Sequence, residues 1–356
     1  MKELIVFITA AAISYLLTIP AIYLAKKIKL VTDIRTRRHP AHTHVGLIPR
    51  GGGLPIYLSI LLTIFIFVPI NKIVLGITIS SLLLIVIGLI DDYYDSSPYA
   101  RFSANLFISA LVISFGLGIP YISNPFGGII RLDSWRYSFD FFGRHSILII
   151  ADIVAIIWLT WTTNLVNWSK GVDGQLPGFV AITAFFLGLL SQRFTAYDIS
   201  TQTVMMLCFI VSGAYLGFLP FNFYPQKIMP GYGGGALAGF LLGILAILSF
   251  GKLGTAFLIL SVPIIDSVYT MIRRIIRKQS PFRADWGHFH HKLLEIGWGK
   301  RRVAIFYWLV SFILGIASLF LQGIEKLAAF ITVGIILLVF IFIIEKLKKT
   351  KHELLH

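Results

Sequence analysis

The feature that most constrains this chain is a series of apolar stretches, each close to the length that spans a lipid bilayer. A spanning helix needs roughly 20 mainly apolar residues, and we count about eleven such stretches. They are 4–25, 53–70, 73–90, 102–121, 146–163, 176–192, 203–219, 236–251, 253–272, 303–321 and 327–345. The sequence therefore predicts an all-α polytopic membrane protein with about 11 transmembrane helices, or about 10 if a weak stretch such as 73–90 or 176–192 does not span.

The composition excludes a water-soluble protein. Of the 356 residues, 57% are hydrophobic and only 13% are charged, and soluble domains carry about 25% charged residues. A single cysteine excludes a disulfide framework within the chain and any CxxC metal or redox site. We therefore expect one integral membrane domain, 1–356, which helix packing in the lipid bilayer holds together.

The basic residues predict how the chain is oriented. The sequence has 31 Lys and Arg and a net charge of +15. If 4–25 is a retained anchor with its N-terminus outside, 23 of the 31 basic residues fall in the alternate loops on the inner side. Because cytoplasmic loops are enriched in Lys and Arg, we expect the N-terminus outside and the C-terminus in the cytoplasm. Topology thus explains the positive charge without a nucleic-acid partner.

One segment on the outer side has a different pattern. Residues 129–142, IIRLDSWRYSFDFF, alternate apolar and polar residues. This alternation fits a short extracytoplasmic β-hairpin and an irregular loop about equally well.

A group of acidic residues lies at the predicted inner end of the third stretch. Asp91, Asp92 and Asp95 are spaced so that a helix would place their carboxylates on one face. There they repel each other unless a cation or a proton lies among them. The cluster fits a magnesium and diphosphate site, and a solvated helix end is the plainer alternative.

A second polar group follows the fifth stretch. Asn164, Asn167, Lys170 and Asp173 recur every three residues. On a continued helix they would form one stripe that offers amides, a cation and a carboxylate. A helix C-terminus that stops at Gly171 and Gly174 explains the glycines but not the stripe.

Two more loops on the same predicted face carry unusual residues. The segment 221–235 contains Asn222 and Lys227 and ends in glycines ahead of a helix, where backbone amides can approach a phosphate. Small residues that let helices pack closely are the commoner explanation of such glycines. The loop 273–302 is basic and contains three histidines within four residues, His288, His290 and His291. This loop suits a phosphorylated ligand better than a transition metal, because no cysteine completes a ligand set.

Two single residues also stand out. Asp266 lies within the ninth stretch, where an ionisable residue is costly, and Arg50 precedes three glycines at the mouth of the second. All of these groups fall on the predicted cytoplasmic face, where loops between bundle helices can assemble a site.

The motifs together resemble those of the polyprenyl-phosphate N-acetylhexosamine-1-phosphate transferases, the glycosyltransferase 4 family. PRGGG, GLIDDYYD, NLVNxxxGVDG, FLPFNFYPxKI, PIIDSVYTMIRR and DWGHFHH occur in the family's order over about residues 30–310. The resemblance implies an integral membrane enzyme that moves a sugar 1-phosphate from a UDP-N-acetylhexosamine to undecaprenyl or another polyprenyl phosphate, with release of UMP. It also implies Mg²⁺ as cofactor, and the HxHH spacing is similar to that of the N-acetylglucosamine branch.

The same resemblance implies a location and a pathway. The active site would lie on the cytoplasmic face of the cell membrane, and the reaction would be the first membrane step of cell-envelope polysaccharide synthesis. The oligomeric state stays open, a homodimer included.

The resemblance also implies roles for individual residues. Asp91 would bind or deprotonate the acceptor phosphate, while Asp92 and Asp95 would shape its site, and Asp173 joins these three as a catalytic candidate. The implied metal ligands are Asn167, Asp92 and Asp173. The implied substrate contacts are Arg50, Asn164, Lys170, Asn222, Lys227, Arg283, His288, His290 and His291.

Two positions depart from the family pattern. Lys170 and Tyr232 stand where the family carries Asp, and the second of these Asp residues is a metal ligand in family members.

Three hypotheses follow. The chain is a working transferase in which Lys170 contacts phosphate and Mg²⁺ is held by Asn167, Asp173 and the Asp91–Asp95 cluster, or it is a non-catalytic relative that binds a nucleotide sugar or polyprenyl phosphate. A transporter is the third, although polar groups near the bilayer midplane would suit that function better.

Overall fold

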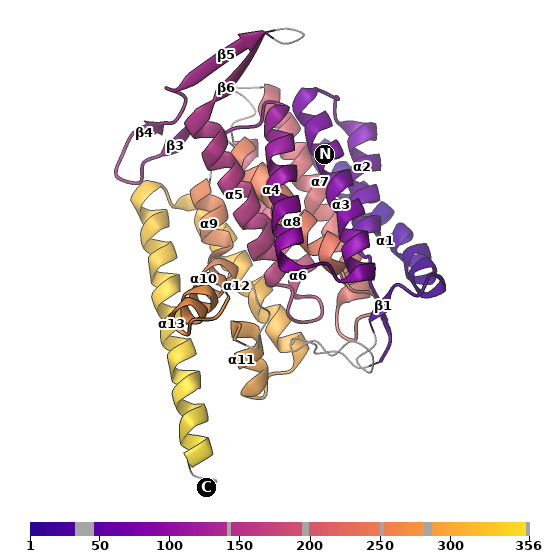
Figure 1. Cartoon of the computed structure of the whole chain (residues 1–356), viewed down its shortest axis with the longest axis vertical. Coiled ribbons are helices and arrows are strands. Elements are labelled where there is room, and N and C mark those ends of the chain that lie inside the picture. Colours follow the sequence, from indigo (N-terminus) through magenta and orange to yellow (C-terminus); the bar gives the residue numbers. More distant parts are fainter. Residues whose placement is uncertain (33–45, 141–143, 194–198, 250–252, 281–286, 354–356) are drawn as a thin grey trace.

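The structure is a computed structural model that describes residues 1–32, 46–140, 144–193, 199–249, 253–280 and 287–353. The described residues form thirteen helices and three short two-stranded sheets (Figure 1). The first helices are α1 (Lys2–Lys27), α2 (Gly53–Phe67), α3 (Lys72–Tyr94), α4 (Pro98–Ser114), α5 (Ile149–Trp168) and α6 (Gln175–Gln192). The others are α7 (Ile199–Asn222), α8 (Gly231–Leu248), α9 (Leu253–Ile259), α10 (Ser261–Ile276), α11 (Phe289–Glu295), α12 (Lys300–Phe320) and α13 (Gly323–Glu353).

Each apolar stretch of the sequence overlaps a helix or, in one case, a bent helix pair. Among the described residues, eight helices are long and apolar enough to cross a membrane, or nine if α9 and α10 form one span. The chain is therefore an all-α, multi-pass membrane protein, as the sequence predicted. Its exact number of crossings and its orientation stay predictions.

Fewer helices qualify as spans than the sequence predicted, for local reasons. Helix α2 has only 15 residues and covers about 22 Å, less than the roughly 30 Å of a hydrocarbon core. It ends just before Pro69, which cannot continue a helix. Helices α9 and α10 meet at an angle of 79°, and Pro263 in the first turn of α10 lacks the N–H that would join the two.

The centre of the bundle is α8, whose glycines allow close backbone contacts. A Cβ on Gly88 of α3 would lie 2.3 Å from the Cα of Gly233, and one on Gly53 of α2 would lie 2.5 Å from the backbone of Gly234. Only glycine fits at such approaches. The first turn of α8 is thereby fixed against the end of α3 and the start of α2.

On the predicted outer side, the strands extend beyond the predicted hairpin. β3 (Tyr121–Ser123) pairs with β4 (Ile129–Arg131), and β5 (Arg136–Asp140) pairs with β6 (Arg144–Leu148). The prediction of a single hairpin at 129–142 is therefore wrong in its pairing, because its two strands belong to different hairpins. Gly127 and Gly128, both with positive φ, make the first turn, and 141–143 lie outside the described residues.

The two ends of the bundle differ in character (Figure 1). The hairpins β3–β4 and β5–β6 lie at one end, while α11 and the C-terminus lie at the other. The third sheet, β1 (Val31–Thr32) with β2 (Ile48–Pro49), leads into α2. The candidate site forms at the end that includes α11.

Candidate functional site

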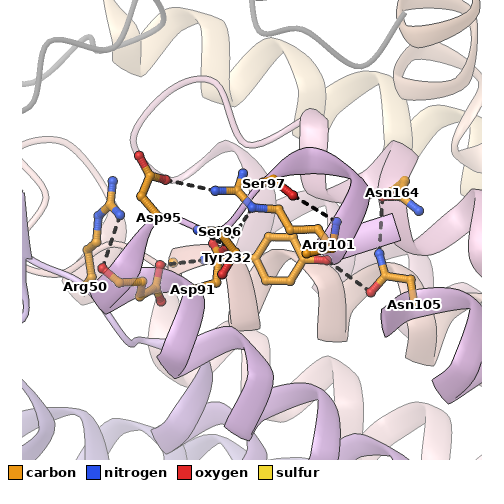
Figure 2. A network of polar contacts seen from close by, with 12 residues as sticks. Arg50, Asp91, Asp95, Ser96, Ser97, Arg101, Asn105, Asn164 and Tyr232 are labelled. Carbon is orange, nitrogen blue, oxygen red and sulfur yellow. Dashed lines mark hydrogen bonds and ion pairs between the residues drawn. The ribbon is translucent and has the colours of Figure 1, made fainter. Parts of the chain in front are cut away.

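The acidic residues at the end of α3 are paired with a cation from the next helix (Figure 2). Asp91 and Asp92 are buried, and Asp95 is the left-handed C-cap residue of α3. Arg101 lies one turn into α4, and its Nε lies 2.6 Å from Asp91 Oδ1 while its Nη2 lies 2.8 Å from Asp95 Oδ1. Arg101 thus supplies a cation that the carboxylate cluster requires. No pattern in the sequence indicated this role.

Asp92 lies against the N-terminus of α8. The backbone N–H of Tyr232 donates to Asp92 Oδ1 at 2.9 Å, and a helix N-terminus favours a negative group there. Gly231 has φ +71°, and a Cβ on it would lie 2.0 Å from Asp92 Oδ2. Glycine is therefore required at this position by both its backbone conformation and its closeness to the carboxylate.

Lys170 reaches the same turn from the loop between α5 and α6. Its Nζ donates to the carbonyl of Gly231 at 2.8 Å and lies 5.9 Å from the centre of the Tyr232 ring. The guanidinium of Arg101 lies 5.4 Å from the same ring. Burial lowers the pKa of Lys170 to about 8, although the charge of Asp92 acts in the opposite direction.

A chain of amides connects Tyr232 with α5 (Figure 2). Tyr232 OH donates to Asn105 Oδ1 at 3.1 Å, and Asn105 Nδ2 donates to Asn164 Oδ1 at 3.2 Å. Asn164 Nδ2 in turn donates to a backbone carbonyl of α5 at 2.7 Å. Asn167 differs: its Oδ1 is buried and has no hydrogen-bond partner among the described residues. Of this group, only Asn167 offers a buried oxygen to a ligand.

The loop from Ser169 to Gly174 connects the acidic cluster to the other polar loops. Asp173 Oδ1 lies 3.4 Å from Lys300 Nζ at the start of α12. The N–H of Gly174 donates to Asn222 Oδ1 at 3.1 Å, and Asn222 Nδ2 donates to the Ile228 carbonyl at 2.9 Å. Asn222 therefore holds this loop in place.

The histidines are positioned by Asp266 of α10. Asp266 Oδ1 accepts the N–H of Phe289 at 2.7 Å, and its Oδ2 lies 3.1 Å from His288 Nδ1. The rings of His288 and His290 stack with centroids 5.5 Å apart. The buried ring of His290 packs on Gly171, where a Cβ would lie 1.9 Å from Nε2. Asp266 thus holds the first turn of α11 and the ring of His288 in place.

Burial also affects the charge of His290. It lowers the pKa of His290 well below the ordinary value, and the neighbouring His291 and His288 lower it further. His290 is therefore neutral at physiological pH. A neutral ring with a buried Nδ1 that has no partner among the described residues offers a hydrogen bond and no charge.

Three predicted residues differ in their placement. Arg50 contacts the cluster, since its Nε bonds to Thr32 Oγ1 and its Nη1 donates to the Asp92 carbonyl at 3.4 Å. Lys227 is exposed. Arg283 lies outside the described residues, so its predicted role remains a prediction.

The residues present do not fit a metal ion held by the protein alone. No three His, Cys, Asp or Glu side chains in the described part of the chain are arranged as a metal site. Asp173 is engaged with Lys300, and a Lys ammonium lies next to the turn that Asp92 contacts. The implied role of Asn167, Asp92 and Asp173 as magnesium ligands therefore stays a prediction.

The chain is similar to known proteins over most of its length. Residues 74–250, which contain the acidic cluster, the Lys170 loop and the start of α8, match the model of glycosyl transferase family 4. A decaprenyl-phosphate N-acetylglucosaminephosphotransferase of Mycobacterium leprae is 30% identical, over 89% of this chain and 84% of its own length.

Two other relatives cover similar shares. A probable undecaprenyl-phosphate N-acetylglucosaminyl 1-phosphate transferase of Bacillus subtilis is 28% identical, over 91% of this chain and 87% of its own. A phospho-N-acetylmuramoyl-pentapeptide-transferase of Geobacillus thermodenitrificans is 26% identical, over 89% and 98%. The similarity extends over most of the chain, and the chain belongs to glycosyl transferase family 4.

Proposed function

We propose that the chain transfers N-acetylglucosamine 1-phosphate, or that of a related N-acetylhexosamine, from the UDP-sugar to a polyprenyl phosphate and releases UMP. The observation that carries the proposal is the convergence of the acidic cluster, Arg50, Arg101 and Lys170 at the start of α8. The names of the N-acetylglucosamine relatives support the choice of donor and acceptor. The product is a lipid diphosphosugar for cell-envelope polysaccharide synthesis.

The chemistry needs charge and position more than a strong base. A phosphate monoester has a second pKa of about 6, so the lipid phosphate is largely a dianion at neutral pH. Its oxygen attacks the phosphorus that carries the sugar, a new P–O bond forms, and the bond to UMP breaks. Negative charge grows on the leaving UMP, and Arg50 and Lys170 are the cations placed to offset it, since Arg101 is already paired with Asp91 and Asp95.

Magnesium is an additional proposal. When bound with the diphosphate, Mg²⁺ would neutralise charge on it. It would arrive with the diphosphate, because the described residues do not hold a metal ion by themselves. The steps above do not depend on it.

The location follows from the predicted topology. Because 23 of 31 basic residues lie on the predicted inner side, we place the site at the cytoplasmic face of the cell membrane. The polyprenyl tail would lie in the bilayer between helices, while the phosphate reaches the end of α3.

A second candidate function is a protein that binds the nucleotide sugar or polyprenyl phosphate without turnover. It is favoured by Lys170 and Tyr232, which stand where the family's sequence pattern has acidic residues. A site with fewer carboxylates can still bind phosphate groups through its cations.

One experiment separates the two candidates. Purified protein is incubated with undecaprenyl phosphate, Mg²⁺ and a panel of UDP-N-acetylhexosamines, and UMP is quantified. Transfer predicts UMP release that requires the lipid and is fastest with one donor. Binding of the donor in calorimetry without UMP release from any donor would favour the second candidate instead.

A further inference from the structure

We propose that Lys170 is the resident cation of this site and occupies the role of a metal ion, so that the protein alone binds divalent cations only weakly. The inference rests on the site of the proposed function but not on turnover. It concerns the ammonium group, Asp92 and the turn between them at Gly231.

The first observation is that the carboxylates of the cluster already have positive partners. Asp91 and Asp95 both pair with Arg101, at 2.6 and 2.8 Å. Asp92 faces the positive end of α8 through the Tyr232 N–H. Asp91 and Asp95 are therefore compensated by Arg101, and Asp92 is stabilised by the end of α8 through one of its two oxygens.

The second observation is that Lys170 and Asp92 approach the same residue. The ammonium donates to the Gly231 carbonyl at 2.8 Å. Asp92 Oδ2 is so close to Gly231 that a Cβ on this residue would lie only 2.0 Å from the oxygen. The positive and negative groups are thus placed about a single glycine, which has no side chain to separate them.

The third observation concerns Asn167, whose buried Oδ1 has no hydrogen-bond partner among the described residues. A Cβ on Gly235 would lie 2.3 Å from this oxygen and 3.1 Å from Lys170 Cδ. The lysine stem therefore runs beside the oxygen that a metal ion would use. An ammonium fixed at this place repels a divalent cation that approaches Asn167 or Asp92.

The arrangement gives Lys170 a specific task in transfer. An ammonium donates hydrogen bonds and carries a single charge, and it needs no ion from solution. Placed at the start of α8, it supplies fixed positive charge to a diphosphate that binds there. The transfer would then depend less on the concentration of divalent cations than transfer by a site of carboxylates.

The test measures binding of Mn²⁺ to the full-length protein in detergent, without substrates, by electron paramagnetic resonance. Four proteins are compared: the unchanged chain, Lys170→Asp, Lys170→Met and Lys72→Met. Lys72 is exposed at the opposite end of α3, so its substitution removes one positive charge far from the cluster. We expect Lys170→Asp to bind Mn²⁺ at least about tenfold more tightly than the unchanged chain.

The Mn²⁺ affinity of Lys170→Met should lie between those of the unchanged chain and Lys170→Asp. The affinity of Lys72→Met should equal that of the unchanged chain. Equal Mn²⁺ affinity in the unchanged chain, Lys170→Met and Lys170→Asp would overturn the proposal. If Lys170→Asp does not fold, the thermal midpoint of Lys170→Met decides, because Mg²⁺ should raise it more than it raises that of the unchanged chain. An equal effect of Mg²⁺ on the two thermal midpoints would also overturn the proposal.

UMP release measured on the same preparations separates this inference from the proposed function. A protein that releases UMP but shows no effect of Lys170 on Mn²⁺ affinity refutes only the resident cation. A protein that shows the effect but releases no UMP refutes only the transferase.

Discussion

The ammonium of Lys170 donates a hydrogen bond to the backbone carbonyl of Gly231, 61 residues away in the sequence, at 2.8 Å. This bond ties the loop after α5 to the first turn of α8, where Asp92 is also bound. Lys170, for which the family resemblance implies a substrate contact, is therefore anchored first to the protein. The charge of Lys170 is then fixed before any substrate arrives.

The pH dependence of transfer tests the charge of Lys170. Its pKa is about 8 instead of the ordinary 10.5, because burial outweighs the attraction of Asp92, while Arg101 and Arg50 lower it further. The ammonium is charged below pH 8 and neutral above it, so UMP release should fall as the pH rises through about 8. Lys170→Arg stays charged and should lack this fall.

The stability of the folded protein should rise over the pH range in which UMP release falls. Because the folded protein holds this proton less tightly than the unfolded chain, the buried ammonium costs stability below pH 8. That cost disappears as the pH rises from about 8 to 10.5. A loss of both activity and stability in this window, measured by UMP release and thermal unfolding, would point to general unfolding and against Lys170.

Arg101 is the residue whose importance the sequence did not reveal. Arg101→Ala leaves Asp91 buried without the cation that lies 2.6 Å away, and we expect about a tenfold or greater loss of UMP release. Arg101→Lys keeps a charge but cannot bridge Asp91 and Asp95 in the same way, so it should restore only part of the rate. Full activity of Arg101→Ala in initial-rate assays would show that this ion pair is not needed.

Gly231 has a matched control in Gly254. Gly231→Ala would force a Cβ to within 2.0 Å of Asp92 Oδ2 at φ +71°, whereas a Cβ on Gly254 meets nothing within 4 Å. We expect Gly231→Ala to reduce UMP release by about tenfold or more and to lower the thermal midpoint. Gly254→Ala should retain both. Equal behaviour of the two variants would contradict the close packing at the start of α8.

Asp266 should act through the histidine loop. Asp266→Ala removes the acceptor for the Phe289 N–H and the partner of His288, which leaves a buried donor unsatisfied and costs about 1–3 kcal/mol. Donor KM should rise more than kcat falls, because the histidines are displaced while the acidic cluster remains. Asp266→Asn keeps an oxygen acceptor and should have a smaller effect. A fall in kcat alone, with KM unchanged, would argue against this positioning role.

The C-terminal helix contributes to the same loop. Lys292 of α11 pairs with Glu345 of α13, which also accepts from Tyr269 OH at 3.2 Å. Glu345 is 44% exposed, so Glu345→Gln should cost under about 1 kcal/mol of stability. We expect donor KM to rise by about twofold to threefold, because a partly exposed ion pair contributes little. A tenfold or greater loss would indicate a more direct role for Glu345.

The sequence predicted the helices well because long apolar stretches leave few alternatives in a bilayer. It also predicted that distant polar loops meet, as Lys170, Asn222 and His290 now do around the loop after α5. The ion pairs of Arg101 could not be predicted, because they depend on the turn between α3 and α4. No local pattern distinguishes Arg101 from other basic residues. The bend between α9 and α10 and the pairing of the outer strands were missed for the same reason, since both depend on contacts outside the segment.

The functional roles could be predicted only through the family resemblance. Spacing alone places carboxylates on one face, yet it does not say whether a metal ion or a side chain neutralises them. At Asp91 the neutralising group is Arg101 of the next helix. Near Asp92 the structure places the ammonium of Lys170, from a different loop, on the carbonyl of Gly231.

The decisive test of the transferase function is UMP release from UDP-N-acetylglucosamine by the purified protein, with and without undecaprenyl phosphate. We expect release at least about tenfold above the lipid-free control, and a loss of this difference in Asp91→Asn. UMP release that never exceeds the lipid-free control, with this or any other UDP-N-acetylhexosamine, would contradict it.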